Sequence, residues 1–196
     1  MEWDIQKITE IHFFGDSLTA GYGTTPENGW VPELGRRCTS LKYYNHGVCG
    51  TVLSDIYDSM MPFLSQRNIT TGFFFMGGTN DILLGYNVKY VQKTLDQIIF
   101  SLCHSTPLCI GIPTLMTVRS IETGWQSDFA FPKNNRDLIE YGNHIKSICI
   151  KQSIPFIDFA SSFPLDDAWY SDGIHPNDKG YRRFADIAEH LLTKHK

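Results

Sequence analysis

Three side chains suited to acyl transfer stand near the two ends of the chain. Ser17 lies in a glycine-rich turn at residues 15–23, directly after an apolar run at residues 11–14, and Asp172 and His175 lie together near the other end. A serine hydroxyl is a weak nucleophile until a base removes its proton. Imidazole, with an unperturbed pKa of about 6.5, is the usual base near neutral pH, and a carboxylate orients it and stabilises its charged form. We therefore predict Ser17 as the nucleophile, His175 as the base and Asp172 as the partner of His175.

Two glycine-rich segments offer hydrogen-bond donors for the oxyanion that acyl transfer creates. The first is residues 47–51, which contain Gly50, and the second is residues 77–81, which contain Asn80. Loss of one such donor typically lowers turnover about 10²–10³-fold. We predict three donors: the backbone N–H groups of Ser17 and Gly50, and the side-chain amide of Asn80.

The elements that must bring these residues together alternate between strand and helix patterns. Apolar runs predict strands at residues 8–14, 41–45, 71–76, 108–112 and 155–158. Helical spacing of apolar residues predicts helices at 29–38, 51–65, 88–103, 134–152 and 177–193. This alternation predicts an α/β fold with a five-stranded, mainly parallel sheet and helices on both faces. Ligands of such sheets bind beyond the carboxyl ends of the strands, which is where Ser17, Gly50 and Asn80 would lie.

Four short motifs, in order along nearly the whole chain, resemble those of the GDSL, or SGNH, hydrolase family of esterases, lipases and thioesterases. They are Gly15-Asp16-Ser17-Leu18, Gly47-x-x-Gly50-Thr51, Gly78-Thr79-Asn80-Asp81 and Asp172-x-x-His175. The resemblance implies a three-layer α/β/α flavodoxin-like sandwich and assigns the same roles to Ser17, Gly50, Asn80, Asp172 and His175. Cys49 departs from the pattern, because a small residue such as serine is commoner beside the second glycine.

Apolar side chains in the loops after the strands are candidates for an acyl pocket. Leu83, Tyr86 and Trp125 are the substrate-binding candidates, although ordinary packing would explain them equally well. Trp125 lies in residues 114–133, the longest segment without a clear period. Long loops in compact domains are often functional.

Composition narrows the class of protein. The length of 196 residues predicts one domain over residues 1–196. A net charge of −4, with no cluster of basic residues, argues against a nucleic-acid partner. No apolar run has the length of a signal peptide or a membrane span, and the five cysteines lack a disulfide or zinc spacing. We therefore expect a cytoplasmic enzyme with no cofactor, no bound metal and no integral membrane contact, acting on a small-molecule ester.

The function predicted from these residues is hydrolysis of carboxylic esters with small to medium acyl chains, through a covalent acyl-enzyme. Two alternatives use the same three residues, namely transfer of the acyl group to another acceptor and hydrolysis of thioesters. A third is a non-catalytic flavodoxin-like module that binds phosphate at residues 15–21. The sequence predicts neither the natural substrate nor the oligomeric state.

Overall fold

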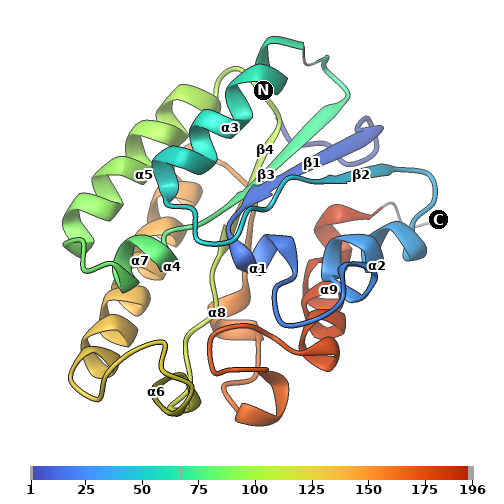
Figure 1. Ribbon diagram of the computed structural model, residues 1–196. Coiled ribbons are helices and arrows are strands. Elements are labelled where there is room, and N and C mark those ends of the chain that lie inside the picture. Colours follow the sequence, from blue (N-terminus) through green and yellow to red (C-terminus); the bar gives the residue numbers. More distant parts are fainter. Residues whose placement is uncertain (1, 67, 194–196) are drawn as a thin grey trace.

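The protein folds around a parallel sheet of five strands, seen in the computed structural model, which describes residues 2–66 and 68–193 (Figure 1). All neighbouring strands run parallel, and their order is β2-β1-β3-β4-β5. The strands are β1 (Glu10–Gly15), β2 (Lys42–Asn45), β3 (Thr71–Met76), β4 (Leu108–Ile112) and β5 (Phe156–Asp158). The predicted α/β fold is confirmed, and the sheet is entirely rather than mainly parallel.

Helices cover both faces of the sheet. The long helices are α2 (Trp30–Arg37), α3 (Leu53–Gln66), α5 (Val88–Leu102), α7 (Ala130–Gln152) and α9 (Asp178–Leu192). Helices α3, α5 and α7 pack on one face, and α2 and α9 pack on the other (Figure 1). The short helices α1 (Ser17–Ala20), α4 (Thr79–Leu83), α6 (Arg119–Glu122) and α8 (Phe159–Ser162) lie in loops after strands. Two 3-10 turns, Pro26–Asn28 and Asp167–Trp169, complete the elements.

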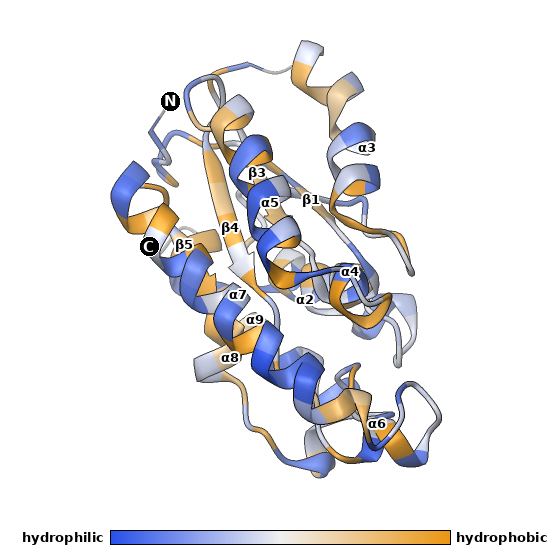
Figure 2. Cartoon of the chain, turned by 90° about the vertical axis from the view of Figure 1, so that its left-hand side faces the viewer, coloured by the Kyte–Doolittle hydropathy of each residue, from blue (hydrophilic) through white to orange (hydrophobic). Residues whose placement is uncertain are grey.

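The central strand β3 is buried along its whole length because both of its faces are covered. Phe73 and Phe75 point into the core under α3, α5 and α7, whereas Phe74 points into the core under α2 and α9. In Figure 2 the strands are largely hydrophobic, whereas α7 carries hydrophilic turns toward solvent. None of the helices in the described part of the chain has both the length and the apolar character that a membrane span needs.

Residues 114–133, expected to lack regular structure, contain α6 and the first turn of α7. Helix α7 begins at Ala130, four residues before the predicted start at residue 134. Pro132 is tolerated there because the first turn of a helix does not use its N–H groups for intrahelical bonds. The hydroxyl of Ser127 accepts a hydrogen bond from the Ala130 N–H at 3.2 Å and supports this earlier start.

Candidate active site

Ser17 is held at the carboxyl edge of the sheet by the turn that joins β1 to α1. Asp16 caps α1, because its Oδ1 accepts a hydrogen bond from the Leu18 N–H at 3.0 Å. The carbonyl of Leu18 accepts a second bond, from the indole N–H of Trp30 at 3.1 Å, and Trp30 is fully buried in the core under α2. The hydroxyl of Ser17 is therefore presented by a single helical turn that is anchored from both sides.

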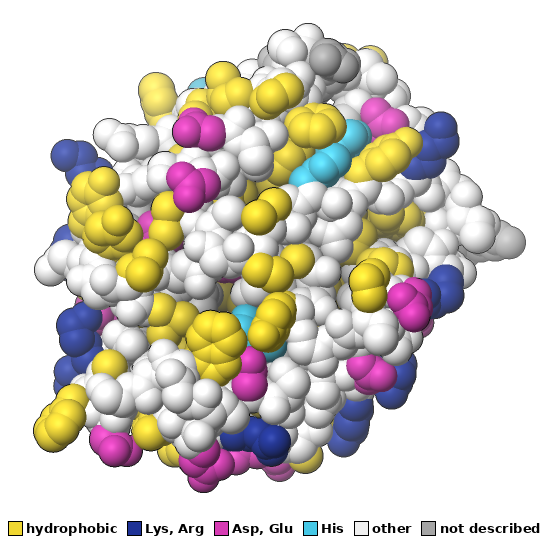
Figure 3. Space-filling view, in the orientation of Figure 1, with side chains coloured by type: hydrophobic (Ala, Val, Ile, Leu, Met, Phe, Trp, Pro, Cys, Tyr) yellow, Lys and Arg dark blue, Asp and Glu magenta, His cyan; other side chains and the backbone are white. Residues whose placement is uncertain are grey.

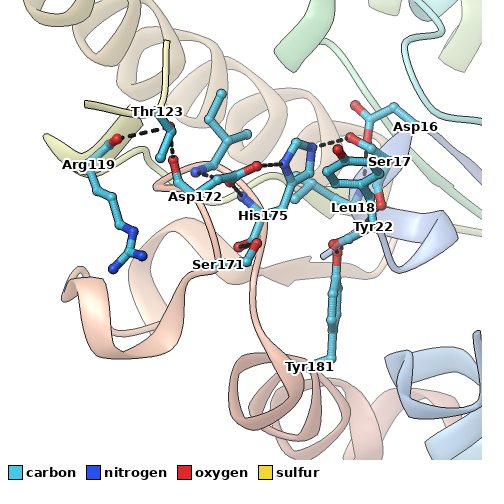
Figure 4. A network of polar contacts seen from close by, with 11 residues as sticks. Asp16, Ser17, Leu18, Tyr22, Arg119, Thr123, Ser171, Asp172, His175 and Tyr181 are labelled. Atoms are coloured by element: carbon cyan, nitrogen blue, oxygen red, sulfur yellow. Dashed lines mark hydrogen bonds and ion pairs between the residues drawn. The ribbon is translucent and has the colours of Figure 1, made fainter. Parts of the chain in front are cut away.

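Asp172 and His175 form a compact loop just before α9 (Figure 4). Asp172 Oδ1 accepts hydrogen bonds from the N–H groups of Ile174 at 3.0 Å and His175 at 2.8 Å. Asp172 Oδ2 lies 2.7 Å from His175 Nδ1, and His175 Nε2 lies 2.8 Å from Ser17 Oγ. The structure thus brings the three residues into one chain of hydrogen bonds, with the Nδ1 proton directed at the carboxylate.

Segment α6 and its flanking residues hold the loop of Asp172 and His175 from outside. The Thr117 N–H donates to the Gly173 carbonyl at 2.9 Å. The Thr123 hydroxyl donates to the Asp172 carbonyl at 2.7 Å, as Figure 4 shows. Gly173 has a φ of +88°, and a Cβ there would collide with the backbone of Ser120. Glycine is needed at this position for both reasons. The segment without sequence period therefore supports the loop that carries the imidazole.

The two acidic groups of the site have opposite environments. Partial burial opposes ionisation of Asp172, but hydrogen bonds from the His175 ring and from backbone N–H groups outweigh it and lower the pKa of Asp172. Asp16 is fully buried, and its Oδ2 has no hydrogen-bond partner among the described residues. Desolvation raises the pKa of Asp16 to about 6. The hydrogen bond from the Leu18 N–H and the charge of His175 act in the opposite direction, but their effect is smaller. Asp172 is thus the carboxylate that stays ionised beside the imidazole.

The groups predicted as oxyanion donors come from three loops at the carboxyl edge of the sheet. Ser17 is the first residue of α1, so the helix itself offers its N–H no partner. Gly50 follows β2 with a φ of +81°, and Asn80 lies in α4, after β3. The Asn80 Nδ2 donates to the Thr51 carbonyl at 2.9 Å, which ties the two loops together and leaves its second hydrogen for another acceptor. Ser17, Gly50 and Asn80 all line one cavity.

This cavity has a volume of ≈ 240 Å³ and opens at the carboxyl edge of the sheet. Of the three substrate-binding candidates, Leu83 and Trp125 line it, and Tyr86 does not. The Tyr86 N–H donates to the Asp81 carbonyl at 3.0 Å, and its ring packs against Tyr90 at a centroid distance of 5.8 Å. The remaining residues of the lining are Tyr22, Cys49, Thr79, Ile174 and His175.

Tyr22 is the lining residue that the sequence analysis missed although a signal was present. It belongs to the same glycine-rich turn as Ser17 and lies five residues after it. The α1 helix is one turn long, so the chain reverses at Gly21 and returns the Tyr22 ring to the site, at 4.5 Å from the His175 ring.

Among residues 2–66 and 68–193, no cluster of His, Cys, Asp and Glu has the arrangement of a metal site.

The central sheet and the helices on its two faces make this a three-layer α/β/α protein, and the order of its strands is that of flavodoxin-like folds. A serine, a histidine and an aspartate are in contact at the carboxyl edge of its sheet. A model of the GDSL-like lipase/acylhydrolase family matches residues 13–183, and the chain belongs to this family. The family predicted from the four motifs is therefore confirmed.

Solved structures agree with this assignment. A member of the lipolytic G-D-S-L protein family from Veillonella parvula matches with a TM-score of 0.80 at 27% identity, over 95% of this chain and 100% of its own. Two further structures, below 25% identity, share the fold. A lipase/acylhydrolase from Enterococcus faecalis has a TM-score of 0.76 at 18% identity, covering 94% of this chain and 95% of its own. The acetyl xylan esterase AlAXEase has a TM-score of 0.75 at 20% identity, covering 93% of this chain and 99% of its own. No curated protein sequence matches the chain.

Replacement of Asp16 by asparagine is expected to stabilise the protein at neutral pH. The pKa of Asp16 in the folded state, about 6, exceeds the ordinary value of 3.8, so folding favours the protonated form. This contribution to stability is present below pH 4 and is lost as the pH rises through 6. At pH 7.5 we expect Asp16→Asn to raise the free energy of unfolding by up to about 3 kcal/mol. Asparagine retains an oxygen that accepts from Leu18.

Urea denaturation at pH 7.5 and pH 4 tests this expectation. The gain of Asp16→Asn over the unmodified protein should shrink at the lower pH. Asp58→Asn, on the exposed face of α3, is the matched control and should give no pH-dependent gain. A stability of Asp16→Asn that is equal to or below that of the unmodified protein at pH 7.5 would contradict the cost assigned to the buried carboxylate.

Proposed function

We propose that this protein hydrolyses carboxylic esters of small to medium acyl chains through a covalent acyl-enzyme on Ser17. The observation that carries the proposal is the chain of contacts from Ser17 Oγ through His175 to Asp172, with distances of 2.8 Å and 2.7 Å. Such an arrangement gives the hydroxyl a base and gives the base a fixed orientation.

In the first step, Ser17 Oγ attacks the carbonyl carbon of the ester while its proton passes to His175 Nε2. The carbonyl π electrons move onto the oxygen, which becomes an oxyanion facing the N–H groups of Ser17 and Gly50 and the amide of Asn80. The carbon–oxygen bond to the alcohol then breaks, and the Nε2 proton transfers to the departing oxygen. Asp172 holds the Nδ1 proton throughout and stabilises the imidazolium.

In the second step, water repeats the reaction in place of the alcohol. His175 Nε2 takes a proton from the water, and the water oxygen bonds to the acyl carbon. The bond between that carbon and Ser17 Oγ breaks, and Oγ recovers the proton from Nε2. A carboxylic acid leaves and the free serine is restored, so the cycle needs no cofactor.

The size of the cavity supports a small substrate. Its volume of ≈ 240 Å³ is below the ~300–1,000 Å³ that is usual for sites of drug-sized ligands. Leu83 and Ile174 give part of its wall an aliphatic surface suited to a short acyl chain. The fold of an acetyl xylan esterase, a protein named for a short acyl group, is compatible with this proposal.

Phosphate binding at residues 15–21 is disfavoured by the cap of α1. The Asp16 carboxylate occupies the helix N-terminus, where a phosphate would otherwise accept hydrogen bonds, and accepts from Leu18 itself. With a pKa of about 6, Asp16 is mainly ionised at neutral pH and would repel an anion.

Covalent labelling with a fluorophosphonate tests the proposed nucleophile. Ser17 Oγ should attack phosphorus, fluoride should leave, and the intact mass should rise by one phosphonyl group. Peptide mapping is expected to locate this group on Ser17, with no label on Ser17→Ala or on heat-denatured protein. Equal labelling of Ser17→Ala, or a label on another residue, would reject the proposal.

A further inference from the structure

Two aromatic rings flank the His175 imidazole on the solvent side of the site. The ring centroid of Tyr22 lies 4.5 Å from that of His175, and the centroid of Trp125 lies 5.2 Å from it. The ring centroids of Tyr22 and Trp125 lie 6.2 Å apart, and the two rings are nearly perpendicular, with an interplanar angle of 89°. Tyr22 is 46% exposed and Trp125 is 45% exposed, so both keep a large free surface beside the cavity that they line. Figure 3 shows hydrophobic side chains next to a patch of histidine colour in the lower centre of this face.

Both rings are positioned by the elements that hold the reacting groups. The Tyr22 N–H donates to the Ser17 carbonyl at 3.0 Å, and the Tyr22 carbonyl accepts from the Tyr181 hydroxyl at 2.8 Å. The Trp125 N–H donates to the Ser120 carbonyl at 2.9 Å, at the end of the α6 segment that supports the loop of His175. The two rings therefore form a fixed corner, which we call the aromatic corner, rather than two independent surface groups.

The proposed reaction determines which part of an ester reaches the aromatic corner. The departing alcohol oxygen receives its proton from His175 Nε2 and must lie about 2.6–3.2 Å from it. The carbonyl oxygen is directed away from the imidazole, toward Gly50 and Asn80. The carbon atoms attached to the departing oxygen consequently lie beside the rings that surround His175.

We infer that Tyr22 and Trp125 form the subsite for the alcohol part of the ester and select alcohols that carry a ring. This inference rests on the proposed esterase function and adds the class of alcohol to it. A ring can stack on one wall of the perpendicular pair while its edge meets the other wall, which are the favoured geometries of aromatic contacts. A linear alkyl chain covers less of each wall and loses more rotational freedom on binding. None of the residues that line the cavity is Lys, Arg, Asp or Glu, so none of these side chains is present there to form an ion pair with a charged alcohol.

Three acetate esters with the same number of carbon atoms in the alcohol test the inference. They are benzyl acetate, cyclohexylmethyl acetate and n-heptyl acetate. We expect kcat/KM of the unmodified protein to be about threefold to tenfold higher for the two ring esters than for the linear one. Comparing benzyl acetate with cyclohexylmethyl acetate shows whether the subsite prefers an aromatic ring or a saturated one. A saturated ring presents C–H groups, as the face of a sugar does.

Variants of the aromatic corner should remove this preference without changing the selectivity for the acyl chain of the ester. Tyr22→Leu and Trp125→Leu should each lower the ring preference, and the double variant should abolish it. Tyr22→Phe keeps a ring and should retain it. Tyr90→Leu is the matched control, since Tyr90 is 59% exposed on α5 and does not line the cavity. The order of activities in a series of esters with varied acyl chains and one fixed alcohol should be the same in all variants.

The outcomes separate this inference from the proposed function. If Ser17→Ala hydrolyses the acetates as fast as the unmodified protein, the proposed function itself fails. If Ser17→Ala is inactive but the unmodified protein shows no ring preference, the inference alone fails. The inference is equally overturned if the double variant keeps the preference, or if the variants change acyl-chain selectivity instead.

Discussion

Replacement of Ser17 by alanine is expected to lower kcat/KM for p-nitrophenyl acetate by at least about 10³-fold, because it removes the atom that forms the acyl-enzyme. The donors of Gly50 and Asn80 remain, so a small residual rate above that of water is compatible with the proposal. The protein should remain folded, since the turn is held by Asp16 and Trp30 rather than by the Ser17 hydroxyl. Initial rates, with circular dichroism and a melting curve for each protein, measure both effects.

The control for this experiment removes a serine oxygen elsewhere. Ser101, whose hydroxyl donates to the Ile98 carbonyl within α5, can be changed to alanine and should leave the rate unchanged. Cys49 lines the same cavity, but desolvation, with the charge of Asp16, raises the pKa of its thiol and keeps it protonated. A protonated thiol is a poor nucleophile. A folded Ser17→Ala protein that turns over the ester at the original rate would therefore remove Ser17 from the mechanism.

The parts of the structure that local patterns determine could be predicted from the sequence. Continuous apolar runs such as residues 71–76 indicate strands buried on both faces, and this run is β3 in full. Asp172 and His175 lie three residues apart, so a tight turn is enough to bring their side chains together, as observed at 2.7 Å. The fold and the relation between these two residues depend mainly on contacts that are short in sequence or repeated along it.

The walls of the cavity depend on contacts without such a signal. Tyr86 follows a strand as Trp125 does, yet the chain after α4 turns its ring onto Tyr90 and away from the cavity. The support of the loop by α6 relies on the pairs Thr117–Gly173 and Thr123–Asp172, which no spacing or composition reveals. These pairs join the segment that carries Trp125 to the loop of His175, so the contact between the two rings depends on tertiary structure.

The two carboxylates of the site illustrate how environment assigns roles to one residue type. Asp172 accepts hydrogen bonds from two N–H groups and the imidazole, and its pKa is lowered. The Asp16 carboxylate directly precedes Ser17 but accepts one bond in a fully buried position, and its pKa is raised to about 6. The first can stabilise an imidazolium at neutral pH, whereas the second stabilises the turn of Ser17. The sequence predicted Asp172 as the partner of His175, and the contact between the two side chains agrees with that prediction.

Asp172→Asn is expected to reduce kcat by about 10³–10⁴-fold. Because folding lowers the pKa of Asp172, the neutral asparagine should also lose some stability at neutral pH, but less than Asp172→Ala loses. The asparagine oxygen can still accept from the N–H groups of Ile174 and His175, so the loop is retained. Its amide N–H₂ would then face His175 Nδ1 and favour the tautomer in which Nδ1 is the acceptor and Nε2 carries the proton. An Nε2–H directed at Ser17 Oγ cannot remove the serine proton.

Kinetics across pH 6–10, with melting curves, distinguish this effect from a disturbed loop. Asp166→Asn is the matched control. Asp166 also accepts a hydrogen bond from a backbone N–H, that of Ala168 at 2.8 Å, but it forms no hydrogen bond or ion pair with a histidine in the described part of the chain. It should keep the original rate, and Asp172→Ala should lose stability as well as activity, because the backbone N–H groups then lose their acceptor. Asp172→Asn with a full rate, or with a loss of activity that matches a loss of folded protein, would show that the carboxylate does not set the tautomer of His175.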